Sequence, residues 1–281
     1  MIMTKKQEVV ELNKPHLSIS QMMMFLKCQR QYYYRYIRGL KLPPSGALLL
    51  GTSVHAGIET NYKQKIETGK DISLKKAVEA YAHRFEEGEK EGVAWNEDEK
   101  PGEVKDMGVE MVSVYHKEIA PKVKPKLVEE WFEVDFENTP YQFVGRIDLV
   151  DKQNRVVDHK TVAPHRIPKQ EDVDKDLQMT GYSLGYRNKY KKAEKEIRMD
   201  YIVKPKKLSP VRIEQITTKR KEKDIDRLLK LMAYVAIGIQ RAKETDVWLP
   251  CQGCLGAKDY WWCANPKFNG YYEINKRELF A

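Results

Sequence analysis

The chain has 281 residues, of which 41% are hydrophobic and 32% are charged, and a formal net charge of +9. This length suits one large domain or two small ones, and the composition supports a hydrophobic core beneath a highly charged surface. No run of 18 apolar residues is present, which excludes a membrane-spanning helix, and residues 1–14 lack the apolar centre of a secretory signal. We therefore expect a cytoplasmic protein with reduced cysteines and no membrane partner.

The basic charge favours an anionic partner. The isoelectric point is about 9.1, and much of the surplus positive charge lies between Tyr186 and Lys230. A lysine-rich surface that only keeps the protein soluble explains this charge equally well. Charge alone therefore leaves nucleic-acid binding as one of two interpretations.

Helices are predicted in the first part of the chain. Residues 1–17 are expected to form a loose leader. Ser18 and Gln21 match a capping box, which predicts a helix over Ile19–Ile37 that ends before Gly39. Residues 40–50 contain two prolines and are predicted to form a loop. Further helices are predicted at Gly51–Lys65, Ile72–Glu91 and Glu103–Ala120, so residues 18–126 are expected to form a helical part.

Short apolar strands are predicted after residue 126. The predicted strands are Leu127–Phe136, Tyr141–Val150, Arg155–Lys160, Ile197–Val203 and Val211–Thr217, and the helices are Asp174–Tyr190 and Lys219–Lys243. Residues 127–245 are therefore expected to form a mixed α/β core. Residues 246–281 form a C-terminal segment that is rich in cysteine and aromatic residues.

The predicted hairpin of residues 145–160 carries charged groups on two apolar strands. Asp148 lies on the first strand, while Asp158 and Lys160 lie on the second, where a spacing of two places them on one face. A four-residue turn would place Val157 opposite Asp148 and point the two acids to opposite faces. A three-residue turn or a bulge would instead place the two acids directly across from each other.

Two facing carboxylates, a divalent cation and an ammonium group are the parts needed to activate water against a phosphodiester. Because Mg²⁺ prefers oxygen ligands, the backbone carbonyl of His159 would suit it as a further ligand. Lys160 would then orient or deprotonate the attacking water. The alternative is an exposed surface hairpin, since Asp-x-Lys alone is a common pattern.

An ordered set of short motifs resembles the PD-(D/E)XK nuclease superfamily, and within it the RecB-like group. The motifs follow the order found in that family. They are a G-x-x-x-H segment (Gly51–His55), a G-x-x-D strand (Gly145–Asp148), a D/E-x-K triplet (Asp158–Lys160) and a Q-x-x-x-Y helix (Gln178–Tyr182). No proline precedes Asp148, a departure that the superfamily tolerates.

This resemblance implies a restriction-endonuclease-like α/β fold, with a mixed central sheet between helices, and a Mg²⁺- or Mn²⁺-dependent DNA exonuclease. The metal ligands it implies are His55, Asp148, Asp158 and the carbonyl of His159. The catalytic residues it implies are Asp148, Asp158, Lys160, Gln178 and Tyr182. Gln178 and Tyr182 lie four residues apart on one helical face, where they would brace the active site and contact DNA.

The four cysteines divide into one before the predicted core and three after it. Cys28 precedes the core, and Cys251, Cys254 and Cys263 follow it. Four thiolates can hold zinc or a 4Fe–4S cluster, although a buried Cys28 could also serve only packing. The division resembles that of RecB-like nucleases with an iron–sulfur cluster, the AddB-like and CRISPR adaptation nucleases. The resemblance implies a 4Fe–4S cluster that staples the chain ends, with zinc as the alternative.

Basic and aromatic residues next to Cys28 are candidate DNA contacts. Arg30 and Arg35 could bind phosphates, while neighbouring tyrosines could stack on bases or pack around Cys28. By resemblance, the substrate is single-stranded or end-bearing DNA. A helicase or recombination protein is a further candidate partner, because the chain has no G-x-x-x-x-G-K-[ST] loop. The alternatives are an endonuclease of the same fold, a non-catalytic nucleic-acid binder and a zinc-stapled interaction module.

Overall fold

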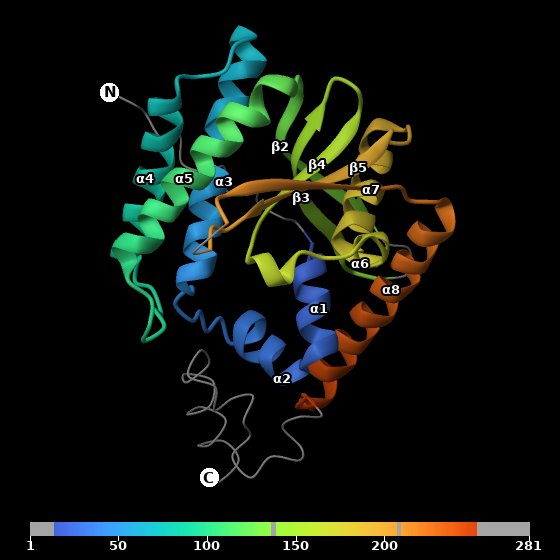
Figure 1. Cartoon of the computed structure of the whole chain (residues 1–281). Coiled ribbons are helices and arrows are strands. Elements are labelled where there is room, and N and C mark those ends of the chain that lie inside the picture. The colour runs from blue at the N-terminus through green and yellow to red at the C-terminus, as the bar shows by residue number, and fades with distance from the viewer. Residues whose placement is uncertain (1–13, 136–138, 207–208, 252–281) are drawn as a thin grey trace.

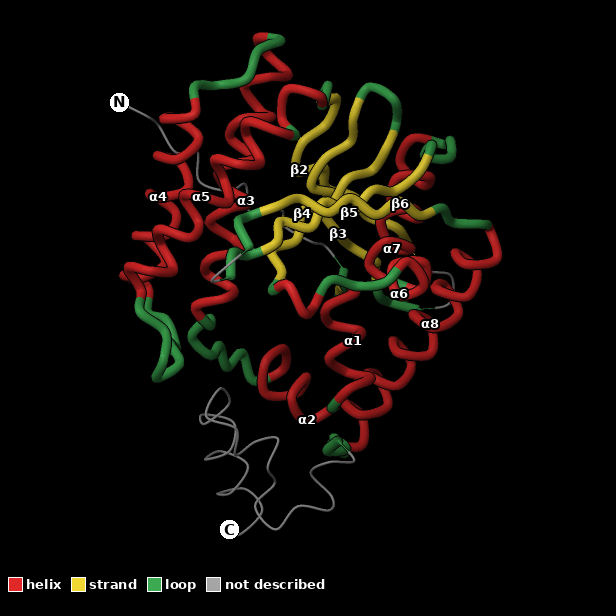
Figure 2. Tube along the Cα trace, viewed as in Figure 1, coloured by secondary structure: helices red, strands yellow, loops and turns green. Residues whose placement is uncertain are grey.

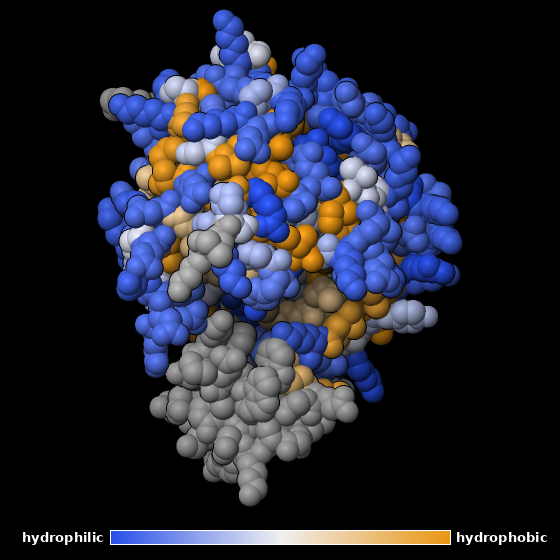
Figure 3. All heavy atoms as spheres, viewed as in Figure 1, coloured by the Kyte–Doolittle hydropathy of each residue, from blue (hydrophilic) through white to orange (hydrophobic). Residues whose placement is uncertain are grey.

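A computed structural model describes residues 14–135, 139–206 and 209–251. A six-stranded mixed sheet lies between two layers of helices, which confirms the α/β class predicted from the sequence (Figures 1 and 2). No helix in these described ranges is long and apolar enough to cross a membrane. Polar side chains predominate on the face of the molecule that Figure 3 shows.

The sheet is built around β3. The strands are β1 His16–Leu17, β2 Pro125–Asp135, β3 Gln142–Asp151, β4 Arg155–Val162, β5 Glu196–Val203 and β6 Arg212–Thr218. Their order is β1-β3-β4-β5-β6, with β2 also paired to β3. The pairs β1–β3 and β4–β5 are parallel, and the others are antiparallel. β1 was expected to belong to a loose leader, but its Leu17 is fully buried, so the sheet extends into that segment.

Two groups of helices cover the two faces of the sheet and create two hydrophobic cores (Figure 1). The longer helices are α1 Ile19–Lys27, α3 Gly46–Thr68, α4 Leu74–Glu91, α5 Pro101–Glu118, α7 Leu177–Tyr190 and α8 Glu222–Thr245. Shorter turns are α2 Gln29–Tyr32, a π-helix at Tyr33–Ile37, α6 Gln170–Lys175, and 3₁₀ turns at Ala120–Lys122 and Pro164–Arg166. Helices α3, α4 and α5 form the first core with one face, and α1, α7 and α8 form the second core with the other.

The capping residues explain where the predicted helices were right and wrong. The Ser18–Gln21 capping box is present and starts α1 as predicted. The expected long helix then breaks at Cys28, whose extended backbone (φ −163°, ψ 108°) separates α1 from α2. Helix α3 begins five residues before the predicted Gly51, because the Ser45 side chain accepts a hydrogen bond from the Leu48 amide and caps it there.

The alternation of side chains along β3 is reset at Asp148. Ile147 and Val150 both pack in the core beneath α7, although residues three apart on a regular strand face opposite sides. β2 shows the same reset at the directly opposite position, where Glu129 adopts a left-handed backbone (φ 56°). A non-glycine residue in this region is costly, so the surrounding sheet must hold it in place. The consequence is that Asp148 and Glu129 sit together at an irregularity shared by two strands.

The packing of α7 against this sheet depends on two glycines around one ring. Phe132 of β2 is almost fully buried, and a Cβ atom added at Gly145 or at Gly185 would overlap its ring. Gly145 lies on β3 and Gly185 on α7, so the ring fills the space between strand and helix. The glycine of the G-x-x-D motif therefore has a packing role, which the motif itself does not reveal.

We predict that Gly185→Ala destabilises the protein by about 1–3 kcal/mol, because overpacking against the buried Phe132 ring outweighs the gain in helix propensity. Chemical unfolding followed by circular dichroism measures this change. Gly102→Ala on α5 is the matched control, since no atom lies within 4 Å of the added Cβ. A Gly185→Ala protein as stable as the Gly102→Ala protein would contradict this packing argument.

Candidate active site

The turn of the β3–β4 hairpin sets the register of the two acids. Leu149 pairs with Val157 and Val150 with Val156, which brings Asp148 opposite Asp158 with a three-residue turn. The sequence analysis required this odd turn, and the pairing confirms it. Asp151 stabilises the turn, because its side chain accepts hydrogen bonds from the backbone amides of residues 153 and 155, each at 2.9 Å.

The paired residues of β3 and β4 end at Leu149 and Val157. Beyond them, the Asp148 side chain rather than its backbone contacts β4. Asp148 Oδ2 accepts a hydrogen bond from the backbone amide of His159 at 3.0 Å. His55 Nε2 of α3 lies 3.2 Å from the same oxygen, and His159 Nδ1 lies 3.5 Å from it. Burial acts to raise the pKa of Asp148, but the charge of the neighbouring His55 holds it well below its ordinary value.

Glu129 is a site residue that sequence reasoning missed. Its Oε1 lies 3.4 Å from His55 Nε2, and its Oε2 lies 3.5 Å from Arg146 Nη1. Burial raises the pKa of Glu129 more than His55 lowers it. The sequence shows only two consecutive glutamates, Glu129 and Glu130, and no periodicity indicates which one faces His55. The left-handed backbone at Glu129 decides this in the folded chain.

Asp158 and Lys160 form a second group next to the first. Asp158 is fully buried, and Lys160 Nζ donates a hydrogen bond to its Oδ1 at 3.1 Å. Burial raises the pKa of Asp158 to about 6, against the opposing effect of Lys160 and with a further rise from Asp148. Burial acts to lower the pKa of Lys160, but the two carboxylates raise it overall, so its ammonium stays charged.

Gln178 and Tyr182 brace Asp158 from α7. Gln178 Nε2 donates a hydrogen bond to Tyr182 Oη at 2.7 Å, and Tyr182 Oη donates one to Asp158 Oδ1 at 3.2 Å. Burial keeps the pKa of Tyr182 well above its ordinary value, so the hydroxyl retains the proton it donates. The predicted Q-x-x-x-Y pair therefore meets the predicted D-x-K triplet in the fold.

The site has the donor atoms for a divalent cation. Three buried side-chain atoms of this site form no hydrogen bond within the described residues, namely Glu129 Oε1, Asp158 Oδ2 and His159 Nδ1. Asp158 Oδ2 does have a charged neighbour, since Lys160 Nζ lies 3.1 Å from it. Buried polar atoms rarely stay unpaired, and a bound ion is one of the explanations for them. Ligand atoms of His55, Asp148 and His159 all lie within 4.8 Å of one another, a spacing that a metal ion can bridge. The residues present therefore fit a metal.

Not all of the predicted metal ligands come together in one group. His55 and Asp148 come together as expected, whereas Asp158 lies outside the group of three and is paired with Lys160 instead. Asp148 and Asp158 are still close enough that the charge of Asp148 raises the pKa of Asp158. His159, expected to contribute its carbonyl oxygen, approaches Asp148 with its imidazole ring.

The predicted DNA contacts and cysteines lie in other elements. Arg30 lies on α2 and Arg35 on the following π-helix, directly after Cys28. Cys28 is buried, and the end of the described chain lies against it, because the Arg30 amide donates a hydrogen bond to the Leu249 carbonyl at 3.2 Å. Cys254 and Cys263 lie outside the described residues.

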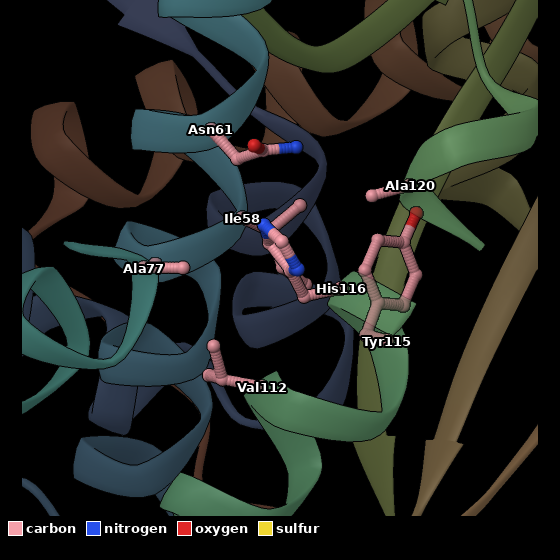
Figure 4. Close-up of a pocket in the computed structure, with 8 residues that line it drawn as sticks. Ile58, Asn61, Ala77, Val112, Tyr115, His116 and Ala120 are labelled. Atoms are coloured by element: carbon pink, nitrogen blue, oxygen red, sulfur yellow. The ribbon is translucent and has the colours of Figure 1, made fainter. Parts of the chain in front are cut away.

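A small cavity between α3, α4 and α5 is separate from these groups. Ile58, Ala77, Val112 and His116 are among its lining residues (Figure 4). Its volume is about 10 Å³, which is room for about one water molecule. The cavity is therefore too small for a nucleotide.

We predict that the metal-free protein loses stability as the pH rises from about 7 to 9. The carboxylates of Asp148 and Glu129 raise the pKa of His55 from 6.5 to about 9 despite its burial. A raised histidine pKa contributes stability that is fully present below pH 6.5 and is lost as the pH rises through 9. The loss is at most about 3 kcal/mol, and unfolding of chelator-treated protein at a series of pH values measures it.

His55→Gln should flatten this part of the stability profile. His83→Gln is the matched control, because His83 is an exposed histidine on α4. If the His55→Gln and His83→Gln proteins lose the same stability between pH 7 and 9, the proposed charge on His55 is wrong.

Comparisons with known proteins identify the family of this chain. A model of the PD-(D/E)XK nuclease superfamily matches residues 16–257. No curated protein matches. A solved structure from Eubacterium rectale, named "Putative exonuclease", is 15% identical, with a TM-score of 0.60 over 90% of this chain and 91% of that one. The structure of SSO0001 is 12% identical, with a TM-score of 0.31 over 86% of this chain and 95% of that one. The family match covers most of the sequence, and the chain belongs to the PD-(D/E)XK nuclease superfamily.

Proposed function

We propose that the protein is a metal-dependent DNA nuclease, and most specifically an exonuclease that acts on single-stranded or end-bearing DNA. The observation that carries this proposal is the adjacency of two groups, Asp148 with His55 and Asp158 with Lys160. The first group offers ligands for a cation, and the second holds an ammonium group beside it. A divalent Mg²⁺ or Mn²⁺ ion bound there would supply Lewis-acid activation of water and neutralise charge on the scissile phosphate.

The chain's own residues hold and position the reacting groups. Lys160 remains charged next to two carboxylates, so it suits hydrogen-bond donation to the attacking water or to charge that develops on the phosphate. Asp158 anchors this ammonium, and Tyr182 with Gln178 fixes the orientation of Asp158. Preorganisation of this kind lowers the cost of ordering the site during the reaction.

Other features support DNA as the substrate. The net charge of +9 favours a polyanion, and the structural neighbour from Eubacterium rectale carries the name of an exonuclease. We propose Arg30 and Arg35 as phosphate contacts, a cytoplasmic location, and a helicase or recombination protein as a partner. An endonuclease of the same fold and a non-catalytic DNA binder are the competing functions.

We predict that Lys160→Met lowers the rate of DNA cleavage by about 10²–10⁴-fold, because the reacting phosphate loses its positioned ammonium. The protein is incubated with end-labelled linear DNA or closed circular DNA in the presence of Mg²⁺ or Mn²⁺. This assay measures the cleavage rate and also distinguishes an exonuclease from an endonuclease. An exonuclease degrades only the linear form. Lys152→Met is the matched control, because Lys152 is an exposed lysine on the turn of the same hairpin.

Two outcomes would contradict the proposal. Full activity of a folded Lys160→Met protein would exclude the assigned role of the ammonium group. DNA binding without cleavage of either DNA form, with Mg²⁺ and with Mn²⁺, would favour the non-catalytic binder. Cleavage of the circular form would favour the endonuclease.

We also propose a 4Fe–4S cluster held by Cys28, Cys251, Cys254 and Cys263, with zinc as the alternative. The support is that Cys28 interrupts a helix to enter the interior, close to Cys251. Burial raises the pKa of the Cys28 thiol, but backbone amides of Gln31 and Cys251 act in the opposite direction. Hydrogen bonds to sulfur of this kind tune iron–sulfur centres.

We predict that Cys28→Ser lowers the melting temperature by about 2–4 °C for each kcal/mol of stability that the lost metal supplies, since metal binding and folding are coupled. Anaerobic purification, visible absorption and analysis for iron and zinc identify the metal. A brown protein that loses its colour in Cys28→Ser supports the cluster, whereas stoichiometric zinc supports the alternative. A metal-free wild type that melts at the same temperature as Cys28→Ser would refute both.

A further inference from the structure

We propose that the imidazole of His159 is itself a ligand of the active-site metal, and that buried Tyr115 and Asp200 orient it for this purpose. The inference rests on the metal site of the proposed function, and it replaces the backbone carbonyl of His159 with its side chain. It makes the centre a site of two imidazoles and one carboxylate, from His55, His159 and Asp148. Such a site takes a first-row transition ion in preference to Mg²⁺.

The geometry places both imidazoles on one carboxylate oxygen. His55 Nε2 is 3.2 Å and His159 Nδ1 is 3.5 Å from Asp148 Oδ2. The three ligand atoms lie within 4.8 Å of one another, the spacing expected around one ion. The His159 side chain is 3% exposed, so its ring is held in the interior rather than in solvent.

A buried hydrogen-bond network holds the other side of the His159 ring. His159 on β4 pairs in register with Asp200 on β5, and Tyr115 of α5 lies between their side chains. Tyr115 Oη is 2.9 Å from His159 Nε2 and donates a hydrogen bond to Asp200 Oδ2 at 3.0 Å. Asp200 is fully buried and also accepts from Arg198 Nε and Gln215 Nε2, each at 2.8 Å. These bonds keep the Asp200 carboxylate fixed as an acceptor.

The hydrogen-bond network favours the tautomer of His159 that carries its hydrogen on Nε2. A tyrosine hydroxyl has one hydrogen, and that of Tyr115 is donated to Asp200. Tyr115 Oη can then accept from His159 Nε2, and the neutral imidazole that fits this arrangement carries its hydrogen on Nε2. Tyr62 Oη lies 3.0 Å from Tyr115 Oη and can donate to the same oxygen. Nδ1 of His159 is left with a lone pair that faces the metal-binding carboxylate.

This lone pair has no partner within the described protein. His159 Nδ1 is buried and makes no hydrogen bond, and its near neighbour Asp148 Oδ2 is another acceptor. Either a proton on Nδ1 or a metal ion between the two atoms would satisfy both, and the 4.8 Å grouping with His55 favours the metal ion. Metal-binding histidines commonly donate their second nitrogen to an oxygen acceptor in this way, and such partners commonly change metal affinity by about 10–100-fold.

The test uses the full chain after removal of its divalent ions, with Mn²⁺ alone as the probe. Pulsed electron paramagnetic resonance of bound Mn²⁺, with ¹⁴N- and ¹⁵N-histidine protein, counts the coordinated imidazole nitrogens. We expect two in the wild type, and one in each of His159→Ala and His55→Ala. Calorimetry should show Mn²⁺ binding weakened about tenfold or more in His159→Ala, and Mg²⁺ binding changed much less.

Tyr115→Phe tests the positioning role, with Tyr62→Phe as the matched control in the same network. Tyr115→Phe removes the acceptor for His159 Nε2, whereas Tyr62→Phe leaves it in place. We expect weaker Mn²⁺ binding, by about tenfold, and an altered coupling from one nitrogen in Tyr115→Phe only. Equal effects of the two variants would reduce Tyr115 to a structural role and overturn this part of the proposal.

One nitrogen coupling or none in the wild type would overturn the proposal, and this measurement does not depend on the folding of any variant. Two couplings that persist in folded His159→Ala would overturn it as well. A failure of the nuclease proposal can be distinguished from a failure of this inference. Lys160→Met should slow DNA cleavage by the predicted factor while both nitrogen couplings stay intact. A wild type that cleaves DNA but shows one coupling would leave only the His159 assignment wrong.

Discussion

The position of Asp148 depends on a shared irregularity of two strands. β2 and β3 both lose their side-chain alternation where Glu129 lies opposite Asp148, and Glu129 adopts a left-handed backbone there. β4 diverges from β3 at the same level, and the Asp148 carboxylate accepts the amide of His159 in place of a ladder bond. A regular sheet would commit Asp148 to one face. The irregularity lets it meet His55 on the α3 side while its charge still acts on Asp158.

Burial makes the charges of this site depend on one another. Asp158 is fully buried beside Lys160, and the charge of His55 holds Asp148 ionised. Removing any one of these charges would leave a neighbour without compensation in the interior, where unpaired charge is expensive. This interdependence ties the stability of the fold to the chemistry of the site, and a bound cation would relieve the remaining unpaired acceptors.

Structural support for the site comes from residues outside every recognised motif. Phe132 fills the space between β3 and α7, the helix that carries Tyr182. Tyr115 and Asp200 hold the ring of His159 from the other core. The segment around Cys28 lies against residues 249–251 at the far end of the described chain. Long-range packing therefore holds a site whose named residues come from short local patterns.

The sequence by itself determined the α/β class and the order of the elements, because strand alternation and turn signals are local properties. It left the register of the Asp148–Asp158 hairpin open between a three-residue and a four-residue turn, and the strand pairing of the fold decided it. The meeting of Tyr182 with Asp158 also followed from the ordered motifs. Only the tertiary structure decided that Glu129 joins His55, that Cys28 breaks a helix, and that His159 approaches Asp148 with its ring. These outcomes depend on a left-handed residue, on buried hydrogen bonds and on contacts between distant elements, and no local periodicity encodes them.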